Sequence, residues 1–352
     1  MLWTNEINRA LQIQFPVIQA PMLGITTPEM VAAISNSGGL GSLPIGGLSP
    51  SAARGIIRKT RSLTDKPFAV NFFAHSIPPV NIQQMERMQD FLEKLCVDDH
   101  LPYIRKAPET FHTHSYKEQI EILISEKIPV VSFTFGIPDD EDINALKNMG
   151  TILIGTATSV KEALLLEKKE IDIICAQGCE AGGHRGSFLE DEPLPLIGTF
   201  SLVPQITRQF TKPVLAAGGI FNGKTIKAAF VLGAQGVQIG TAFIACNESM
   251  AAPSWKTAIQ RAPENENILT MCITGRWARG IRNRLITAIE NSDLDIPAFP
   301  WQGLLTAQIR TLSKEQDNFD FAAMWAGQSF SHIETKPAVE IFKKLIEEAE
   351  QA

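Results

Sequence analysis

The amino-acid sequence predicts an α/β fold, and specifically a (β/α)8 barrel. Short apolar runs that end in glycine or polar residues alternate eight times with helical segments between residues 16 and 241. This alternation is typical of a barrel of parallel strands, whose active site is built from the loops at the carboxyl ends of the strands. A doubly wound open sheet is the competing fold. It normally has fewer such units and carries a Gly-x-Gly-x-x-Gly turn after its first strand, which this chain lacks.

Each expected strand is a short apolar run, and the expected strands are residues 16–22, 39–43, 68–73, 129–135, 151–157, 171–176, 213–217 and 236–239. Two helices begin at recognisable caps, because Thr27 precedes Pro28 and Ser49 precedes Pro50. After a short helix at residues 4–11, the helices that alternate with the strands are expected at residues 27–36, 49–63, 116–125, 140–149, 160–168, 201–210 and 223–232.

Two parts of the chain depart from this alternation. Residues 74–127 are longer than a simple crossover and carry a second helical pattern at residues 82–95. The alternation stops near residue 249, so we expect a barrel of residues 1–248 and a mostly helical C-terminal subdomain of residues 249–352 over the barrel mouth. Within that subdomain we expect helices at residues 248–262 and 337–352, and packed loops at residues 274–280 and 325–328.

The composition indicates a soluble globular protein. The chain has 352 residues, 44% of them hydrophobic, which suffices for a large core. Its net charge of −6 argues against binding to nucleic acid, which needs a surplus of Lys and Arg on one face. No apolar stretch has the length of a membrane span or the pattern of a signal peptide, so the expected location is the cytoplasm. There the five cysteines are expected to be reduced thiols.

The segment from residue 171 to 187, IDIICAQGCEAGGHRGS, carries the most chemistry. Its first half resembles a strand buried on both faces, and Gln177, Gly182, Gly183 and His184 follow at once. Glycines allow a flat ligand to approach the main chain, and Gln177 can offer a donor and an acceptor to the edge of a heterocycle. The imidazole of His184 would lie over the bound molecule. The alternative interpretation is a glycine-rich turn with a solvated histidine.

Two further glycine-bearing strand ends indicate a phosphate site. Gly218 and Gly219 follow the seventh expected strand, and Gly240 and Thr241 follow the eighth. In such barrels a phosphate is commonly held by main-chain N–H groups at these two loops. With Gln177, Asn71 and the backbone of residues 22–24 available for a ring, the pattern favours flavin mononucleotide (FMN) over a nicotinamide cofactor. Either glycine pair taken alone could be no more than a tight turn.

The same segments resemble the nitronate monooxygenases, formerly called 2-nitropropane dioxygenases. The matching blocks are FPVIQAPMLG (15–24), AVNFF (69–73), AQGCEAGGHRG (176–186), AAGGI (216–220), QIGTAF (238–243), TGRWARGIRN (274–283) and WAGQS (325–329). The resemblance implies an FMN-dependent barrel with His184 as the catalytic residue. Together with the matching blocks, it places these residues at the cofactor: Met22, Leu23, Gly24, Asn71, Gln177, Gly182, Gly183, Gly218, Gly219, Gln238, Ile239, Gly240, Thr241 and Gln328.

The activity that this resemblance implies is the oxidation of alkyl nitronates, such as propionate 3-nitronate, with O2 to a carbonyl compound and nitrite or nitrate. A nitronate is a stabilised carbanion that can reduce a flavin without a strong base, so the protein mainly has to hold an anion against the ring. His184 could orient the nitro oxygens or remove the α-proton of a neutral nitroalkane, and both roles stay open. The chain could form a homodimer, and no metal site is expected.

Two other functions are compatible with these motifs. The first is a flavin-dependent NAD(P)H enoyl-acyl-carrier-protein reductase, which shares the barrel and the flavin loops. The second is a non-catalytic flavin-binding barrel in which His184 only clamps the cofactor. Arg276, Arg279, Arg282 and Arg284 could draw an anion toward the mouth, although a structural role between the tail and the barrel is the favoured interpretation.

Overall fold

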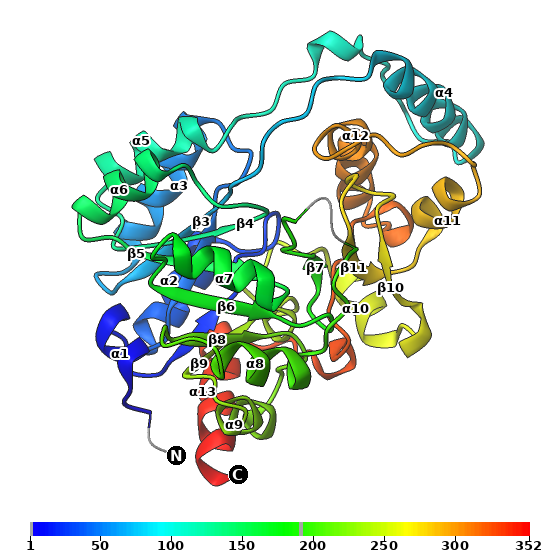
Figure 1. The fold of residues 1–352 in the computed structure, drawn as a ribbon. Helices are drawn as coiled ribbons and strands as arrows, with labels where there is room; N and C mark the ends of the chain where they lie inside the picture. The colour runs from blue at the N-terminus through cyan, green and yellow to red at the C-terminus, as the bar shows by residue number, and fades with distance from the viewer. Residues whose placement is uncertain (1–2, 190–192) are drawn as a thin grey trace.

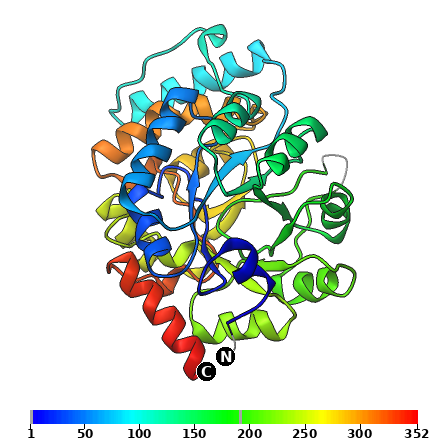
Figure 2. The same ribbon diagram turned by 90° about the vertical axis from the view of Figure 1, so that its left-hand side faces the viewer.

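A computed structural model shows eight parallel strands arranged as a barrel, which confirms the predicted fold class; it describes residues 3–189 and 193–352 (Figures 1 and 2). The barrel strands are β1 (Val17–Gln19), β2 (Gly41–Pro44), β3 (Phe68–Phe73), β4 (Val130–Thr134), β5 (Ile152–Ala157), β6 (Ile173–Gln177), β8 (Val214–Ala217) and β9 (Gly236–Ile239). They are hydrogen-bonded in the order β1-β9-β8-β6-β5-β4-β3-β2. A parallel bridge between Ile18 and Leu40 brings β1 and β2 together and nearly closes the ring.

Helices surround the strands and follow the predicted alternation. The helices of the outer layer are α2 (Pro28–Asn36), α3 (Pro50–Leu63), α5 (Lys117–Ser125), α6 (Asp140–Asn148), α7 (Val160–Lys168), α8 (Thr199–Thr207), α9 (Gly223–Val231) and α13 (Ala338–Gln351). Thr27 accepts a hydrogen bond from the backbone of Met30, and Pro28 occupies the first turn of α2, as its sequence predicts. α13 packs on α9 and α2 and therefore belongs to the outer wall of the barrel rather than to its mouth.

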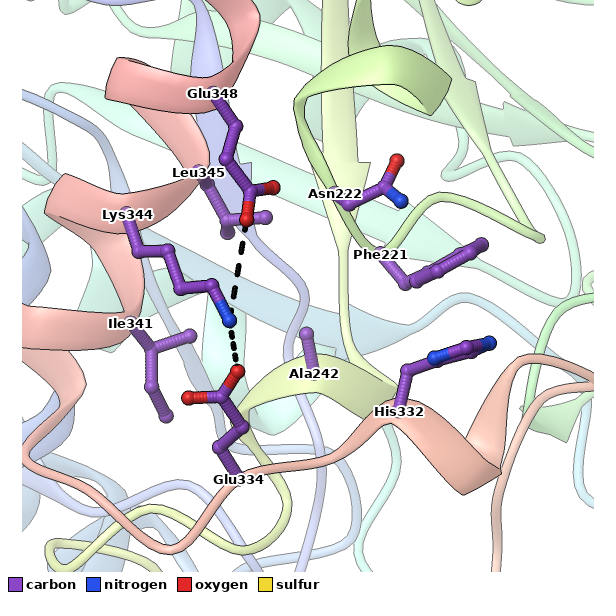
Figure 3. Close-up of a pocket in the computed structure, with 9 residues that line it drawn as sticks. All are labelled: Phe221, Asn222, Ala242, His332, Glu334, Ile341, Lys344, Leu345 and Glu348. Atoms are coloured by element: carbon purple, nitrogen blue, oxygen red, sulfur yellow. Dashed lines mark hydrogen bonds and ion pairs between the residues drawn. The ribbon is translucent and has the colours of Figure 1, made fainter.

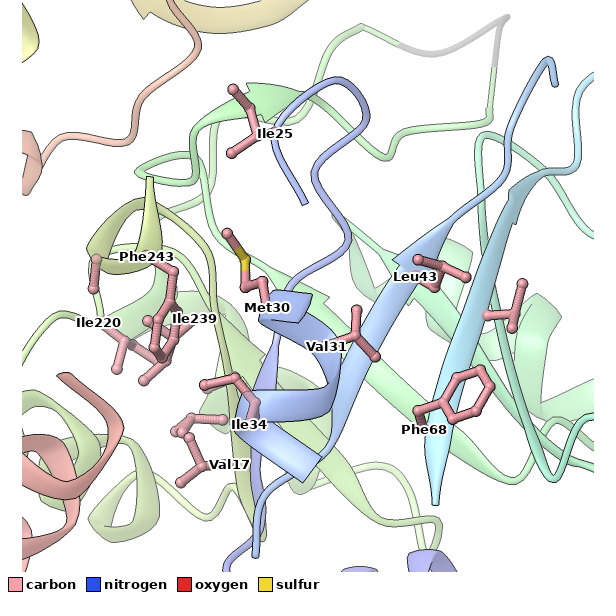
Figure 4. Close-up of a cluster of buried hydrophobic side chains, with 14 of the residues drawn as sticks. Val17, Ile25, Met30, Val31, Ile34, Leu43, Phe68, Ile220, Ile239 and Phe243 are labelled. Carbon is pink, nitrogen blue, oxygen red and sulfur yellow. The ribbon is translucent and has the colours of Figure 1, made fainter. Parts of the chain in front are cut away.

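Two apolar layers stabilise the barrel. The first lies between strands and outer helices, and Figure 4 shows the part of it where Met30 and Ile34 of α2 lie near Val17 and Phe243. The second fills the barrel interior, where Ile18, Leu40, Ala69, Val130, Ile154, Ile173 and Leu215 form one cluster with Ile7 and Leu11 of α1 (Glu6–Leu11). Because α1 packs against the interior residues near the amino ends of the strands, the opposite end is left for a ligand.

A second unit, which we call the cap, stands beside the barrel mouth. Its helices and strands are α4 (Ile82–Asp98), α10 (Pro253–Arg261), β10 (Asn267–Thr270), β11 (Ala278–Ile281), α11 (Arg284–Glu290) and α12 (Trp301–Glu315). Its core joins Met88 and Leu92 of α4 to Leu285 of α11 and Leu305 of α12, and Figure 1 shows these helices side by side. The cap is therefore built from two segments far apart in the sequence, one of them the long insertion after β3.

The cap differs in detail from the expectation for residues 249–352. Residues 278–280, expected within the packed loop 274–280, belong to strand β11, which pairs with β10 and with the two-residue strand β7 (Gly183–His184). Helices α11 and α12 are not among the helices expected from the sequence. Five short 3-10 helices complete the described structure: Pro108–Thr110, Thr241–Phe243, Glu264–Glu266, Phe319–Phe321 and Phe330–His332. Within residues 3–189 and 193–352, no helix is long and apolar enough to cross a membrane.

Candidate active site

His184 stands at the seam between barrel and cap. The chain leaves β6 at Gln177, turns through the glycine-rich segment and enters β7, where His184 pairs with Ala278 of the cap strand β11. The imidazole Nε2 lies 2.8 Å from the Thr274 hydroxyl, and which of the two donates depends on the tautomer of the ring. The cap therefore holds the residue predicted to be catalytic in two ways. Its backbone pairs with β11, and its ring meets Thr274 from the loop between β10 and β11.

Aromatic rings surround the imidazole. The ring centroids of Phe135, Phe299 and Trp325 lie 5.5, 5.7 and 5.6 Å from that of His184. Phe135 follows β4 and has a φ of 72°, a conformation that a bulky residue seldom adopts and that is common at functional sites. We call the group of rings formed by Phe73, Phe135 and Phe299 the aromatic box. Such a wall suits the alkyl part of a small substrate.

The electrostatic surroundings keep His184 neutral. Burial, and after it the positive charges of Arg276 and Arg310 and a smaller effect of His75, lower the pKa of His184 to about 3. Arg276 lies over the Phe135 ring, with its guanidinium carbon 4.2 Å from the centroid. Arg310 on α12 bonds the Thr306 hydroxyl and the Gly303 carbonyl, and burial lowers its pKa to about 10. Two guanidinium groups thus favour an anion near His184.

The Gln177 side chain is fixed by its own loop. Its carbonyl oxygen accepts hydrogen bonds from Arg185 Nη1 at 3.0 Å and from the Gly186 N–H at 2.8 Å. Because both neighbours can only donate, the amide nitrogen must point the other way, where it donates to the His184 carbonyl at 3.1 Å. Arg185 is itself 1% exposed. One N–H of Gln177 is left to face a ligand.

The two glycine loops predicted to hold a phosphate lie at the carboxyl ends of β8 and β9. Gly218 and Gly219 have φ values of 106° and 72°, which glycine adopts readily and other residues do not. Among the described residues, no protein acceptor takes the N–H groups of Gly219 and Gly240. The Thr241 hydroxyl accepts a hydrogen bond from Gly327 N at 2.9 Å and keeps its own hydrogen for a ligand. These donors suit a phosphate group.

Glu180 and Gly182 join these loops to residues 325–329. The Glu180 carboxylate accepts hydrogen bonds from the N–H and hydroxyl of Thr199 at the start of α8, and its carbonyl accepts one from the Gln328 N–H at 2.9 Å. A Cβ on Gly182 would lie 2.3 Å from the backbone nitrogen of Gly327. Gly182 is therefore needed for close contact between two backbones, a role in addition to the one expected from the sequence.

The other residues expected at the cofactor occupy different environments around the mouth. The Asn71 side chain donates to the Ser132 hydroxyl at 2.9 Å and is buried. Gln238 lies on β9 and is partly exposed, whereas the Ile239 side chain belongs to the core outside the barrel. Leu23 is exposed, and neither Gly24 nor Gly183 has an atom within 4 Å of the position that a Cβ would take. Only main-chain atoms of Ile239 and Gly24 are available to a ligand.

Sequence reasoning did not identify every residue around His184. No motif in the sequence indicates a functional role for the side chains of Thr274, His75 and Arg310, and Phe135 is predicted only as the last residue of a strand. The arginines of the 274–284 segment mostly bridge elements, since Arg279 donates to the Cys179 and Asn267 carbonyls, and Arg284 pairs with Asp99. An aromatic residue directly after a predicted barrel strand is a signal that could have drawn attention to Phe135.

A separate cavity of about 240 Å³ opens on the outer wall (Figure 3). Lys344 of α13 bridges Glu334 and Glu348 there, while Phe221 and His332 stack with centroids 4.3 Å apart. Lys344 pairs with both carboxylates, and Lys336 also pairs with Glu334, so each of these charged groups has a partner of opposite sign. It does not include His184 or the glycine loops.

Comparison with known proteins identifies the family. The family model described as nitronate monooxygenase matches residues 5–348. The chain belongs to the nitronate monooxygenase family. A probable nitronate monooxygenase of Staphylococcus aureus (strain Newman) is 41% identical over 354 residues, which cover 99% of each chain. The resemblance inferred from the sequence motifs is thereby confirmed, and the protein is a flavin-dependent oxidoreductase of this family.

Solved structures agree with this assignment. A nitroalkane oxidase from Streptomyces ansochromogenes superposes with a TM-score of 0.87 at 32% identity, over 97% of this chain and 98% of that one. FabK from Thermotoga maritima superposes with a TM-score of 0.78 at 29% identity, over 99% and 96% of the two chains. In both comparisons the match extends over nearly the whole of this chain, so it includes the cap as well as the barrel.

Proposed function

We propose that the protein binds one FMN without a covalent bond and uses it to oxidise alkyl nitronates, such as propionate 3-nitronate, with O2 to a carbonyl compound and nitrite or nitrate. The observation that carries this proposal is a neutral imidazole in an aromatic box, with Arg276 and Arg310 close enough to lower the pKa of His184. Such surroundings favour a small substrate that has an apolar body and a negative head.

The residues of the mouth fit FMN. The N–H groups of Gly219 and Gly240 and the Thr241 hydroxyl would hold the phosphate. The remaining N–H of Gln177 and the side chain of Asn71 would meet the ring. The flavin supplies the electron transfer to O2 when it is bound. Donors at the ends of β8 and β9 and amides at the ends of β3 and β6 surround one opening, as a mononucleotide requires.

The protein's own residues then hold and orient the substrate. The guanidinium groups attract the nitronate, and the aromatic box excludes water from its carbon chain. His184, fixed through Thr274, can donate a hydrogen bond to a nitro oxygen or, with a neutral nitroalkane, accept the α-proton. An anion bound beside the imidazole would raise its pKa and so favour the protonated form.

Anaerobic mixing of the purified yellow protein tests this function. An alkyl nitronate should bleach the flavin absorbance, and NADH alone should not. In air the same nitronate should be consumed with uptake of O2 and release of nitrite or nitrate. Chromophore released by heat should be FMN. Rapid bleaching by NADH would support a reductase instead, bleaching by neither would support a binding protein, and recovery of FAD would refute the cofactor assignment.

A further inference from the structure

His75 lies in the same aromatic box as His184, although no sequence motif points to it. It follows the end of β3, and its ring centroid lies 4.8 Å from that of Phe299, 6.2 Å from that of Phe135 and 6.5 Å from that of Phe73. Phe135 and Phe299 also contact His184. The two imidazoles therefore pack against the same two phenylalanine rings.

The ring nitrogens of His75 are buried and poorly paired. Neither Nδ1 nor Nε2 has a hydrogen bond of normal geometry within the described residues, and neither is accessible to solvent. The backbone of Phe73 is a weak partner at most, and its effect on the pKa of His75 is smaller than that of burial. Burial, and after it the charge of Arg276, lower the pKa of His75 to about 4, so the ring is neutral near pH 7. A neutral imidazole still carries one N–H donor. A buried donor whose protein acceptor is poorly placed is costly, which points to a ligand that supplies a better acceptor.

We propose that His75 is a second substrate-binding residue, which donates a hydrogen bond to an anionic oxygen of the nitronate and makes the site select the ionised substrate over the neutral nitroalkane. This inference rests on the proposed function, and it assigns recognition of the anion to a residue in the loop after β3. Three phenylalanines surround the ring, so the imidazole N–H is a polar group on an otherwise aromatic wall, next to the Arg276 guanidinium over Phe135. A hydrogen bond to a charged oxygen is roughly twice as strong as one to a neutral oxygen, which gives the preference its physical basis.

Steady-state kinetics of His75→Phe on both forms of one substrate tests the preference. Loss of a hydrogen bond to a charged group should lower kcat/KM for the nitronate about ten- to hundredfold, mainly through KM. The neutral nitroalkane should be affected less, and flavin content should be unchanged. His75→Asn keeps a donor and should recover part of the loss. Equal kcat/KM losses on the two substrate forms, or none, would overturn the proposal.

His332→Phe is the matched control. His332 also stacks on a phenylalanine, since its centroid lies 4.3 Å from that of Phe221, but it lines the outer cavity (Figure 3). The same chemical change there should leave kcat/KM for both substrate forms at the wild-type values. A loss in this control as large as that in His75→Phe would show that the kinetic effect is not specific to the box, and would count against the proposal.

Binding of nitrate, a planar oxyanion that is not oxidised, separates this proposal from the proposed function. Titration of the holoenzyme with nitrate should shift the NMR signals of one imidazole. These signals should be missing from the spectrum of His75→Phe, or from that of His75→Asn if the first variant does not fold. A shift at His75 in a protein that does not oxidise nitronates would refute only the function. Normal nitronate oxidation without any shift at His75 would refute only the role of this histidine.

Discussion

At the scale of single residues, the site depends on how His184 is held rather than on its presence alone. Its Nε2 meets the Thr274 hydroxyl, and its carbonyl accepts the hydrogen bond from Gln177. The cofactor contacts are expected from Gln177 and the glycines, so the imidazole is free to face the substrate. Its two open roles, orientation of an anion and removal of a proton, differ in whether the ring must change its protonation state.

His184→Asn separates these roles. Asn keeps a hydrogen-bond donor but does not titrate near neutral pH, so the variant should retain the fold and the flavin and lose roughly 10²- to 10⁴-fold in turnover of the neutral nitroalkane. Oxidation of preformed nitronate should suffer less, the reverse of the pattern for His75→Phe. The measurement is kcat/KM for both forms with flavin content determined on the same preparation. Equal losses would show that His184 only positions the anion.

At the scale of elements, the functional groups come from loops whose backbone is fixed by glycines and by neighbouring strands. Gly218 and Gly219 adopt positive φ after β8, and Gly182 allows residues 326–327 to touch the loop after β6. These positions were predictable because glycine pairs directly after apolar runs are easily recognised. The contact between Gly182 and Gly327 was not, since it joins segments far apart in the sequence and leaves no local pattern.

Gly219→Val tests the phosphate loop. The φ of 72° is unfavourable for a β-branched residue by about 1–3 kcal/mol, and the side chain would stand where backbone N–H groups meet phosphate. Flavin content per folded protein should therefore drop. Gly150→Val is the matched control, because Gly150 has a φ of 76° and open space around its Cβ position but precedes β5 at the amino ends of the strands. Full flavin occupancy in Gly219→Val would show that the phosphate does not bind at this loop.

At the scale of the whole molecule, the barrel was predictable from sequence, whereas of the cap only a mostly helical C-terminal part was. Each barrel unit carries its own signal, such as the Thr27 cap of α2 or the apolar run of β3, and the units follow one another. The cap core instead joins Leu92 of α4 to Leu305 of α12, and neither segment has a complete core of its own. A periodic pattern indicates local structure, but it does not tell which distant segments will pack together.

Global stability should fall on mild acidification because two histidines are held neutral. The pKa values of His184 and His75, about 3 and about 4 in the folded protein, lie below the 6.5 of a free histidine. Between about pH 6.5 and 4 the unfolded chain binds more protons, so the free energy of unfolding decreases as pH falls. Urea unfolding at several pH values should show this slope. The dependence of the unfolding free energy on pH should be flatter in the double variant His75→Phe with His184→Asn. An unchanged slope would contradict the low pKa values of the two histidines.

Strand β7 ties the reactive end of the barrel to the cap. It belongs to the barrel by chain connectivity, because it follows β6, but it is hydrogen-bonded to β11 of the cap. Thr274, which meets the ring of His184, lies in the loop between β10 and β11, so the cap holds both the backbone and the side chain of this residue. The barrel supplies the glycine loops after β8 and β9, whereas the cap fixes the imidazole. The distance between histidine and cofactor loops is therefore set by how the two units fit together.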